Sequence, residues 1–314
     1  MPTATLIVSP LASRIRDADT RARIVESAQA SIVRRGIADI RVVVSGDHAE
    51  IRAAAAASVG RGDALVVVAG GDGTVRDATG PLAGTSLDVA ILPCGTGNLY
   101  ATAVGVPRSM PKALEAVATG SPTPVDHASV RLVAPPGMPA DRLPAKALAF
   151  GVACGTGFDA ELIAATDREL KRRYGVAAYF LTAGRLLPRL APRPARIVVD
   201  GEATELDAVV VLVANCGDAI PGTLRPRLPL DARDGLLHVF VLPRGGVVGG
   251  IRGMLELMIS ESQGVSPSGH SARLTGREVR VEMTPAAPTQ VDGDPFPAAW
   301  LEAHVLPGAL RVIG

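Results

Sequence analysis

The sequence predicts two domains: a doubly wound, parallel α/β domain over residues 1–124 and an antiparallel β-sandwich over residues 125–304. Strand-like and helix-like segments alternate up to about residue 120, which is typical of a parallel sheet with helices on both faces. After Gly120-Ser121-Pro122-Thr123-Pro124, short strands of alternating apolar and polar residues dominate, as in a sandwich. The length of 314 residues fits two domains, and hydrophobic residues, 47% of the chain, can fill two cores.

The elements of the first domain follow from apolar runs and from signals at helix ends. Short runs rich in β-branched residues predict buried parallel strands. Asp47 is a candidate N-cap residue, and Pro111 suits the first position of a helix. The predicted strands are 5–8, 41–44, 64–69 and 88–92, and the predicted helices are 18–35, 47–58, 75–79, 99–104 and 111–119.

The second domain is predicted mostly as strands, because its apolar residues alternate with polar ones. A proline-rich segment, 135–144, is expected to be a long hairpin loop, and the small polar segment 262–271 is expected to be mobile. Two helices are predicted, at 160–187 and 247–259. The predicted strands are 128–133, 146–153, 195–199, 208–214, 236–242, 278–283 and 301–306.

Gly70-Gly71-Asp72-Gly73-Thr74 directly follows the predicted strand 64–69. Glycines at the end of a strand and the start of a helix let backbone N–H groups approach an anion, and the helix start adds partial positive charge. A carboxylate in such a loop repels a phosphate unless a cation lies between them. Asp72 is therefore a candidate for Mg²⁺ contact or proton abstraction.

A second loop, Pro93-Cys94-Gly95-Thr96-Gly97-Asn98, follows the predicted strand 88–92. Loops at the carboxyl ends of neighbouring parallel strands face one crevice. Neither loop has the Gly-Lys-Ser/Thr of a Walker A motif or the third glycine of the dinucleotide fingerprint. One such loop alone could be an ordinary strand-to-helix turn, but the ordered pair favours phosphoryl chemistry.

Two acidic clusters stand out in the second domain. Asp231-Ala232-Arg233-Asp234-Gly235-Leu236 leads into a predicted strand, and Asp292-Gly293-Asp294 places two carboxylates around a glycine. Asp-Gly is also a common turn dipeptide, so each cluster taken singly is more simply explained as a turn.

Composition excludes several classes of function. A net charge of +1 gives no general attraction to nucleic acid. The three cysteines, at 94, 154 and 216, are too widely spaced for a disulfide framework or a zinc site, which fits a reducing cytoplasm. No apolar run reaches the roughly 20 residues that a bilayer-spanning helix needs.

In the order of its motifs, the chain resembles the diacylglycerol kinase catalytic-domain family, which includes bacterial lipid kinases and sphingosine kinases. The resemblance covers nearly the whole chain. Besides the two loops and the two acidic clusters, it rests on Gly155-Thr156-Gly157-Phe158-Asp159-Ala160, Asn215 and Val305-Leu306-Pro307-Gly308-Ala309-Leu310. The resemblance implies an active site in the cleft between the domains and a final segment, 305–314, that returns to the first domain.

The resemblance also implies roles for individual residues. Asp72 is expected near Mg²⁺ or in catalysis, and either Asp292 or Asp294 is expected to accept the proton of a lipid hydroxyl. A structural Mg²⁺ is expected at Asp231, Asp234 and the carbonyl of Leu236. ATP is expected at Ser9, Ser45, Gly70, Gly71, Asp72, Gly73, Thr74, Gly95, Thr96 and Asn98.

The expected partner is a lipid at a membrane surface: diacylglycerol, a long-chain base, ceramide or a related lipid. The segment 168–196 combines many basic residues with aromatic and aliphatic ones, and could lie on an anionic membrane. A helix with a packed apolar face and a solvated basic face explains it more simply. The expected location is the cytoplasm, with attachment to the inner membrane face as an option, and a homodimer is kept as one option for assembly.

Two alternatives stay open. A soluble NAD kinase shares the Gly-Gly-Asp-Gly-Thr loop, although its Asn-Glu pair and Pro-Thr-Gly-Ser segment are replaced here by residues 93–98. A catalytically degenerate lipid- or nucleotide-binding relative is suggested by three departures from the family pattern: Ser9, Arg76 and Leu99.

Overall fold

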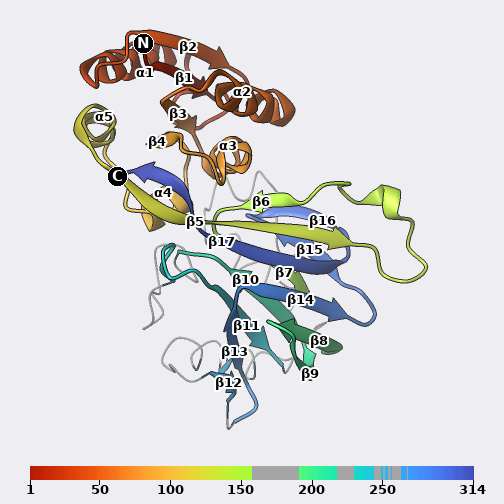
Figure 1. Ribbon diagram of the computed structural model, residues 1–314. Helices are drawn as coiled ribbons and strands as arrows, with labels where there is room; N and C mark the ends of the chain where they lie inside the picture. Colours follow the sequence, from red (N-terminus) through yellow and green to blue (C-terminus); the bar gives the residue numbers. More distant parts are fainter. Residues whose placement is uncertain are drawn as a thin grey trace. The chain divides into compact units, whose positions relative to one another are not determined.

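The structure is a computed structural model that describes residues 1–157, 191–217, 230–243, 249, 252–253, 256, 263–266 and 268–314. The chain divides into two compact units. Unit 1 comprises residues 1–127, 231–235 and 306–314, and unit 2 comprises residues 128–230 and 236–305. Figure 1 labels the helices and strands.

Unit 1 contains a parallel sheet in the order β2-β1-β3-β4-β17. Its strands are β1 (Thr3–Val8), β2 (Asp39–Val44), β3 (Leu65–Gly70), β4 (Asp88–Pro93) and the end of β17 (Trp300–Ile313), of which Arg311–Ile313 pair with β4. The predicted return of the C-terminal segment is therefore a parallel strand at the edge of this sheet.

Helices cover both faces of the unit 1 sheet. Alternate residues of β1, β3 and β4, such as Leu6, Val67 and Leu92, pack against α1 (Ala18–Arg34) and α5 (Met110–Thr119). The intervening residues are also buried, and α2 (His48–Arg61) and α3 (Asp72–Thr79) contact β1 and β3. Burial on both faces explains why these strands are continuous apolar runs. A short helix α4 (Leu99–Ala103) and a 3₁₀ turn η1 (Gly80–Leu82) complete the unit.

Unit 2 is built from two antiparallel layers. One has the order β12-β13-β11-β10-β7-β15-β16, and the other joins the first part of β17 to β14, β8 and β9, with β5 and β6. The bounds are β5 (Pro122–Val133), β6 (Leu148–Phe150), β7 (Ala153–Gly157), β8 (Arg193–Val199), β9 (Glu202–Ala208), β10 (Val210–Ala214), β11 (Leu237–Leu242), β12 (Gly264–Val265), β13 (Ala272–Gly276), β14 (Glu278–Met283), β15 (Pro288–Val291) and β16 (Asp294–Ala298).

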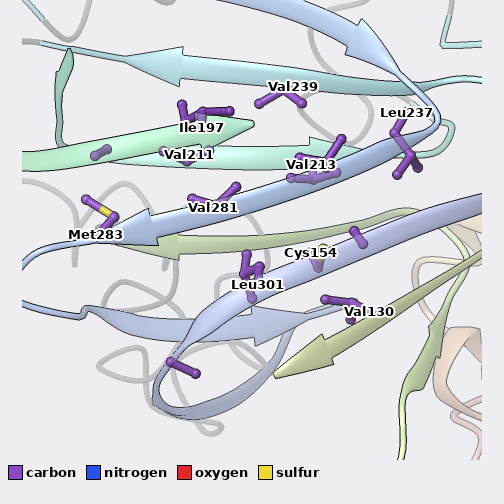
Figure 2. Packing of buried hydrophobic residues seen from close by; sticks show 14 of the residues in the cluster. Val130, Cys154, Ile197, Val211, Val213, Leu237, Val239, Val281, Met283 and Leu301 are labelled. Carbon is purple, nitrogen blue, oxygen red and sulfur yellow. The ribbon is translucent and has the colours of Figure 1, made fainter. Parts of the chain in front are cut away.

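The inner faces of both layers form one core. Ile197, Val281 and Leu301 come from one layer, and Val211 and Val239 come from the other (Figure 2). Sheets packed face to face through alternating inward residues form a β-sandwich. The predicted fold class, a doubly wound parallel α/β part with an antiparallel sandwich, is confirmed.

Several predicted elements differ in detail. The strand predicted at 146–153 is two strands, β6 and β7, separated by a turn at residues 151–152. Strands β9, β13, β15 and β16 were not predicted, and the segment 262–271, predicted to be mobile, contains β12. The hairpin loop predicted at 135–144 connects β5 and β6 and contains the 3₁₀ turn η2 (Ala140–Arg142). The helix predicted at 160–187 lies outside the described residues, as does most of the one predicted at 247–259.

Candidate active site

The first glycine loop lies at the carboxyl end of β3, the central strand of the unit 1 sheet. β3 ends at Gly70, and α3 begins at Asp72 with Gly71 as its N-cap residue, three residues earlier than predicted. A Cβ at Gly70 would lie 2.5 Å from the Cβ of Thr74, so only glycine fits there. Gly71 has no side chain to cap α3, so the first-turn N–H groups of this helix can bind a phosphate.

The second glycine loop follows β4 and touches the first. A Cβ at Gly95 would lie 2.6 Å from the Cα of Gly71, so the two loops meet backbone to backbone. The buried Asn98 side chain accepts a hydrogen bond from the Gly95 N–H at 2.9 Å and donates one to the Gly95 carbonyl at 2.8 Å. Asn98 has a left-handed backbone, with φ at 50°. Its side chain therefore fixes the shape of the second loop.

Asp72 connects the two loops through its carboxylate. Its Oδ1 accepts a hydrogen bond from the Tyr100 N–H at 3.1 Å, and a Cβ at Gly97 would lie 3.0 Å from its Oδ2. Because the Asn98 side chain turns to Gly95, Asp72 caps α4 in its place. Burial raises the pKa of Asp72, and backbone hydrogen bonds from residues 98–100 partly oppose that rise. A half-buried acid with a raised pKa beside a candidate phosphate site suits cation contact or proton transfer.

The other predicted nucleotide-binding residues also lie at the carboxyl ends of the unit 1 strands. Ser9 and Ser45 follow β1 and β2, and Thr96 lies in the loop after β4. The Ser45 hydroxyl donates a hydrogen bond to the Glu50 carboxylate in the first turn of α2. The Thr96 hydroxyl donates to the Ser13 hydroxyl at 3.1 Å. The structure thus gathers these residues at the carboxyl ends of the parallel strands, where ligands of such sheets bind.

Arg14 is a residue at this edge that sequence reasoning missed. Its backbone N–H donates to the Cys94 carbonyl at 3.0 Å, and its Nη1 lies 3.4 Å from the carbonyl oxygens of Pro93 and Arg108. In the sequence, Arg14 is an arginine shortly after the first strand, and no motif marks it as part of the site. Burial raises the pKa of the Cys94 thiol to about 12, so this thiol stays protonated at neutral pH.

The acid pair lies in unit 2, on the hairpin between β15 and β16. Val291 pairs with Asp294, and the two turn residues, Asp292 and Gly293, have φ values of 48° and 84°. The Asp292 carboxylate accepts hydrogen bonds from the N–H groups of residues 151, 152 and 153, at 2.8, 2.9 and 3.1 Å. Asp294 begins β16 and is exposed. The two acids therefore have different surroundings: Asp292 holds a turn, and Asp294 is accessible from solvent.

Asn215 holds the same turn from a second strand. Its backbone N–H donates to the Val152 carbonyl at 2.8 Å, and its Nδ2 donates to the Gly151 carbonyl at 3.0 Å. Asn215 is fully buried, and its Oδ1 has no hydrogen-bond partner among the described residues. The turn at 151–153 is therefore held by side chains distant in sequence.

The loop 231–235 belongs to unit 1, and its anchor is another residue that sequence reasoning missed. Asp126, a buried residue of β5, accepts hydrogen bonds from the Gly235 N–H at 2.7 Å and the Gly308 N–H at 2.8 Å, one on each carboxylate oxygen. The Asp126 N–H donates to the Ala232 carbonyl at 2.7 Å. The only signal in the sequence was an isolated acid beside a predicted strand.

The donor set of this loop does not suit the resident Mg²⁺ that the resemblance implies. Mg²⁺ requires six oxygen ligands in near-octahedral geometry. The Asp231 carboxylate is 3.6 Å from the Arg233 guanidinium. The nearby Asp126 already uses both oxygens for backbone N–H groups. In the described part of the chain, no three His, Cys, Asp or Glu side chains form a cluster that could hold a metal ion. Asp231, Asp234 and the Leu236 carbonyl stay predicted ligands only.

Other predictions fall where little is described. Most of the basic segment 168–196 lies outside the described residues, as do Phe158 and Asp159. Over the ranges that the structure describes, no helix has both the length and the apolar character needed to cross a membrane.

Two family models together match nearly the whole chain. The diacylglycerol kinase catalytic domain matches residues 3–130, and the YegS C-terminal NAD kinase beta sandwich-like domain matches residues 152–314. A diacylglycerol kinase of Mycobacterium tuberculosis is 31% identical, over 92% of this chain and 90% of its own length. An uncharacterized protein of Synechocystis sp. is 28% identical over 81% of this chain, which spans 56% of that protein.

A solved structure shows the same fold. A crystal structure of a Bacillus anthracis str. Sterne protein matches with a TM-score of 0.74, covering 99% of this chain and 96% of the other at 23% identity. At that identity the likeness supports the fold alone, and the family rests on the sequence matches.

Proposed function

Because the chain belongs to the diacylglycerol kinase family, a family of lipid kinases, we propose that it transfers the γ-phosphoryl group of ATP to a hydroxyl of diacylglycerol or a related lipid. The related acceptors are long-chain bases and ceramide. The chemistry is the same for all of them, since each offers an alcohol at the surface of an apolar aggregate.

One observation supports the proposal most. The two glycine loops meet backbone to backbone, so the first turn of α3 and the loop after β4 form one surface of main-chain groups. Close contact of this kind is open only to glycine. Phosphoryl transfer needs positioned donors and charge neutralisation more than covalent help from the protein. The first turn of α3, which no side chain caps, supplies donors of that kind, and the Asp72 carboxylate lies against the second loop.

We assign a separate role to each acid. In the reaction, the lipid hydroxyl oxygen forms a bond to the γ-phosphorus, the bond to ADP breaks, and the hydroxyl proton passes to a carboxylate. Asp294 is the proposed base because Asp292 is held by three N–H groups. Asp72 is proposed to act at the nucleotide, which binds as its Mg²⁺ complex. Ser9, Ser45, Thr96 and Asn98 are proposed to shape the nucleotide site.

The direct test is transfer of label from ATP to lipid. The protein is incubated with γ-labelled ATP, Mg²⁺ and mixed vesicles that contain diacylglycerol, a long-chain base and ceramide, with NAD also present. We expect labelled lipid, identified by chromatography and mass spectrometry. The same reaction with α-labelled ATP is the control, because phosphoryl transfer leaves the α-phosphate in ADP. If the label appears on NAD instead of lipid, the protein is an NAD kinase and the proposal is wrong. If the protein binds ATP but forms no labelled product, it is a catalytically degenerate relative.

A further inference from the structure

Arg233 joins the loop 231–235 to the end of α4. The Arg233 Nη2 donates a hydrogen bond to the carbonyl of Val104 at 3.0 Å, just after the last residue of α4. The Arg233 Nη1 lies 3.6 Å from Asp231 Oδ1 in the same loop. Gly105 has a left-handed backbone, and a Cβ there would lie 3.7 Å from Nη2, so the guanidinium fits closely against this turn.

The Arg233 guanidinium contacts the same kinds of oxygen atom that would bind a divalent cation in this loop. It contacts one carboxylate and one carbonyl oxygen, and carboxylate and carbonyl oxygens are the ligands that Mg²⁺ and Ca²⁺ use. A divalent cation on Asp231 would lie within a few ångströms of the guanidinium, where two positive charges repel. Arginine keeps its charge at every accessible pH and offers several donors at once.

Asp126 attaches the loop 231–235 at a second point. Its two oxygens accept hydrogen bonds from Gly235 and Gly308, so a buried carboxylate holds the loop and the last strand together through direct hydrogen bonds. A carboxylate that accepts backbone N–H groups directly forms strong, charge-assisted hydrogen bonds. The loop is therefore attached by protein groups at its middle residue, Arg233, and at its last residue, Gly235.

We infer that the Arg233 guanidinium is the built-in cation of this loop and holds it in place of a structural divalent metal. Through Val104 it also restrains α4, the helix that Asp72 caps at its other end. The inference concerns stability in the absence of nucleotide, so it stands or falls independently of the kinase proposal. Mg²⁺ that arrives with ATP is a separate ion at the nucleotide.

The test measures unfolding and bound metal in the full chain without ATP. We expect the wild-type melting temperature to be the same in EDTA, in Mg²⁺ and in Ca²⁺, and gel-filtered protein to carry no stoichiometric metal by elemental analysis. We expect Arg233→Ala to lower the melting temperature by roughly 2–6 °C. Arg16→Ala is the matched control, because Arg16 is exposed and its side chain makes no hydrogen bond or ion pair with the described residues, and we expect no change.

A second variant separates a loop-bound metal from a general effect of salt. If wild-type protein loses thermal stability in EDTA and regains it with Mg²⁺, and the response disappears in the Asp231→Asn/Asp234→Asn double variant, the inference is overturned. A response that the double variant retains places the metal elsewhere and leaves the inference standing. An unchanged melting temperature in folded Arg233→Ala would also overturn it.

Discussion

At Asp72, a carboxylate that lies against the candidate phosphate site also caps α4 through the Tyr100 N–H. Burial raises its pKa, so its charged form is less favourable in the folded protein than in the unfolded chain. When the pKa of an acid is higher in the folded protein than in the unfolded chain, its contribution to the free energy of unfolding is fully present below the unfolded pKa. That contribution is lost as the pH rises through the folded pKa. Near neutral pH, the charge of Asp72 therefore costs stability.

The isosteric variant Asp72→Asn separates function from folding. Its amide oxygen can still accept the Tyr100 hydrogen bond, but the charge is gone. We expect the free energy of unfolding at pH 7 to equal or exceed that of wild type, with the difference shrinking below about pH 4. We expect the rate of lipid phosphorylation to fall roughly 10²-fold or more. Urea unfolding at the two pH values and the labelling assay measure both quantities, and a less stable variant that keeps its rate would contradict the assignment.

The two acids of the β15–β16 hairpin should respond in opposite ways. Asp292→Asn turns one oxygen into a donor that opposes a backbone N–H of residues 151–153, so we expect a loss of about 1–3 kcal/mol in the free energy of unfolding. Asp294→Asn, at an exposed position, should leave stability unchanged and lower the rate roughly 10²-fold or more. Chemical unfolding and initial rates test the pair. A stable Asp292→Asn with no activity would reverse the two roles.

At the scale of the elements, contact between the two glycine loops predicts which glycines tolerate a methyl group. Gly95→Ala would place a Cβ 2.6 Å from the Cα of Gly71, and the loops would have to separate. We expect a loss of about 1–3 kcal/mol in stability, because overpacking a close contact typically costs that much. A Cβ at Gly73 has no neighbour within 4 Å, so Gly73→Ala should keep its stability.

Gly73→Ala is also the sharper probe of the ligand. Because the described protein leaves space beside Gly73, only a bound molecule can clash with the new methyl group. We expect ATP affinity, measured by calorimetry, to fall for Gly73→Ala without any change in melting temperature. If the affinity for ATP is unchanged, the phosphates do not bind at the first turn of α3.

The elements that could be predicted from the sequence are those whose two faces are both buried. Strands β1, β3 and β4 are continuous apolar runs because helices cover both sides of them. Two of these runs, β3 and β4, are followed directly by the glycine loops, so predicting the strands also predicted the position of the candidate phosphate site. Asp47 was predicted as an N-cap because its signal is local, and its carboxylate accepts hydrogen bonds from the N–H groups of Ala49 and Glu50.

The elements that were missed depend on edges and on distant contacts. β9 has four exposed or charged positions in its seven residues, and β16 contains two prolines, because the edge of a sheet needs few apolar side chains and tolerates proline. The break between β6 and β7 depends on Asp292 and Asn215, which are remote in sequence from the turn they hold. Asp126 was missed for the same reason: its partners, Gly235 and Gly308, are close to it only in the folded chain.

At the scale of the whole molecule, stability toward acid depends on which buried carboxylates gain hydrogen bonds on folding. Asp63 lies at the opposite end of the unit 1 strands from the glycine loops. Burial alone would raise its pKa, but hydrogen bonds from Thr3, Thr5 and Arg61, at 2.6, 2.7 and 2.9 Å, outweigh burial and lower it. Because its folded pKa is lowered, Asp63 affects the pH dependence of stability in the direction opposite to Asp72. The stability that Asp63 contributes is present above the unfolded pKa and is lost as the pH falls through the folded pKa.

Asp63→Asn should therefore weaken the protein most at neutral pH. We expect a loss of about 1–3 kcal/mol in the free energy of unfolding at pH 7, since a buried acceptor of three donors is replaced by a group that is itself partly a donor. The difference from wild type should narrow below about pH 4, where Asp63 of the unfolded wild-type chain begins to take up a proton before Asp63 of the folded protein does. Glu115→Gln is the control, because the Arg34–Glu115 pair is more than half exposed and should contribute little. Urea unfolding from pH 3 to pH 8 measures both variants, and a constant difference across that range would show that the Asp63 charge does not stabilise the fold.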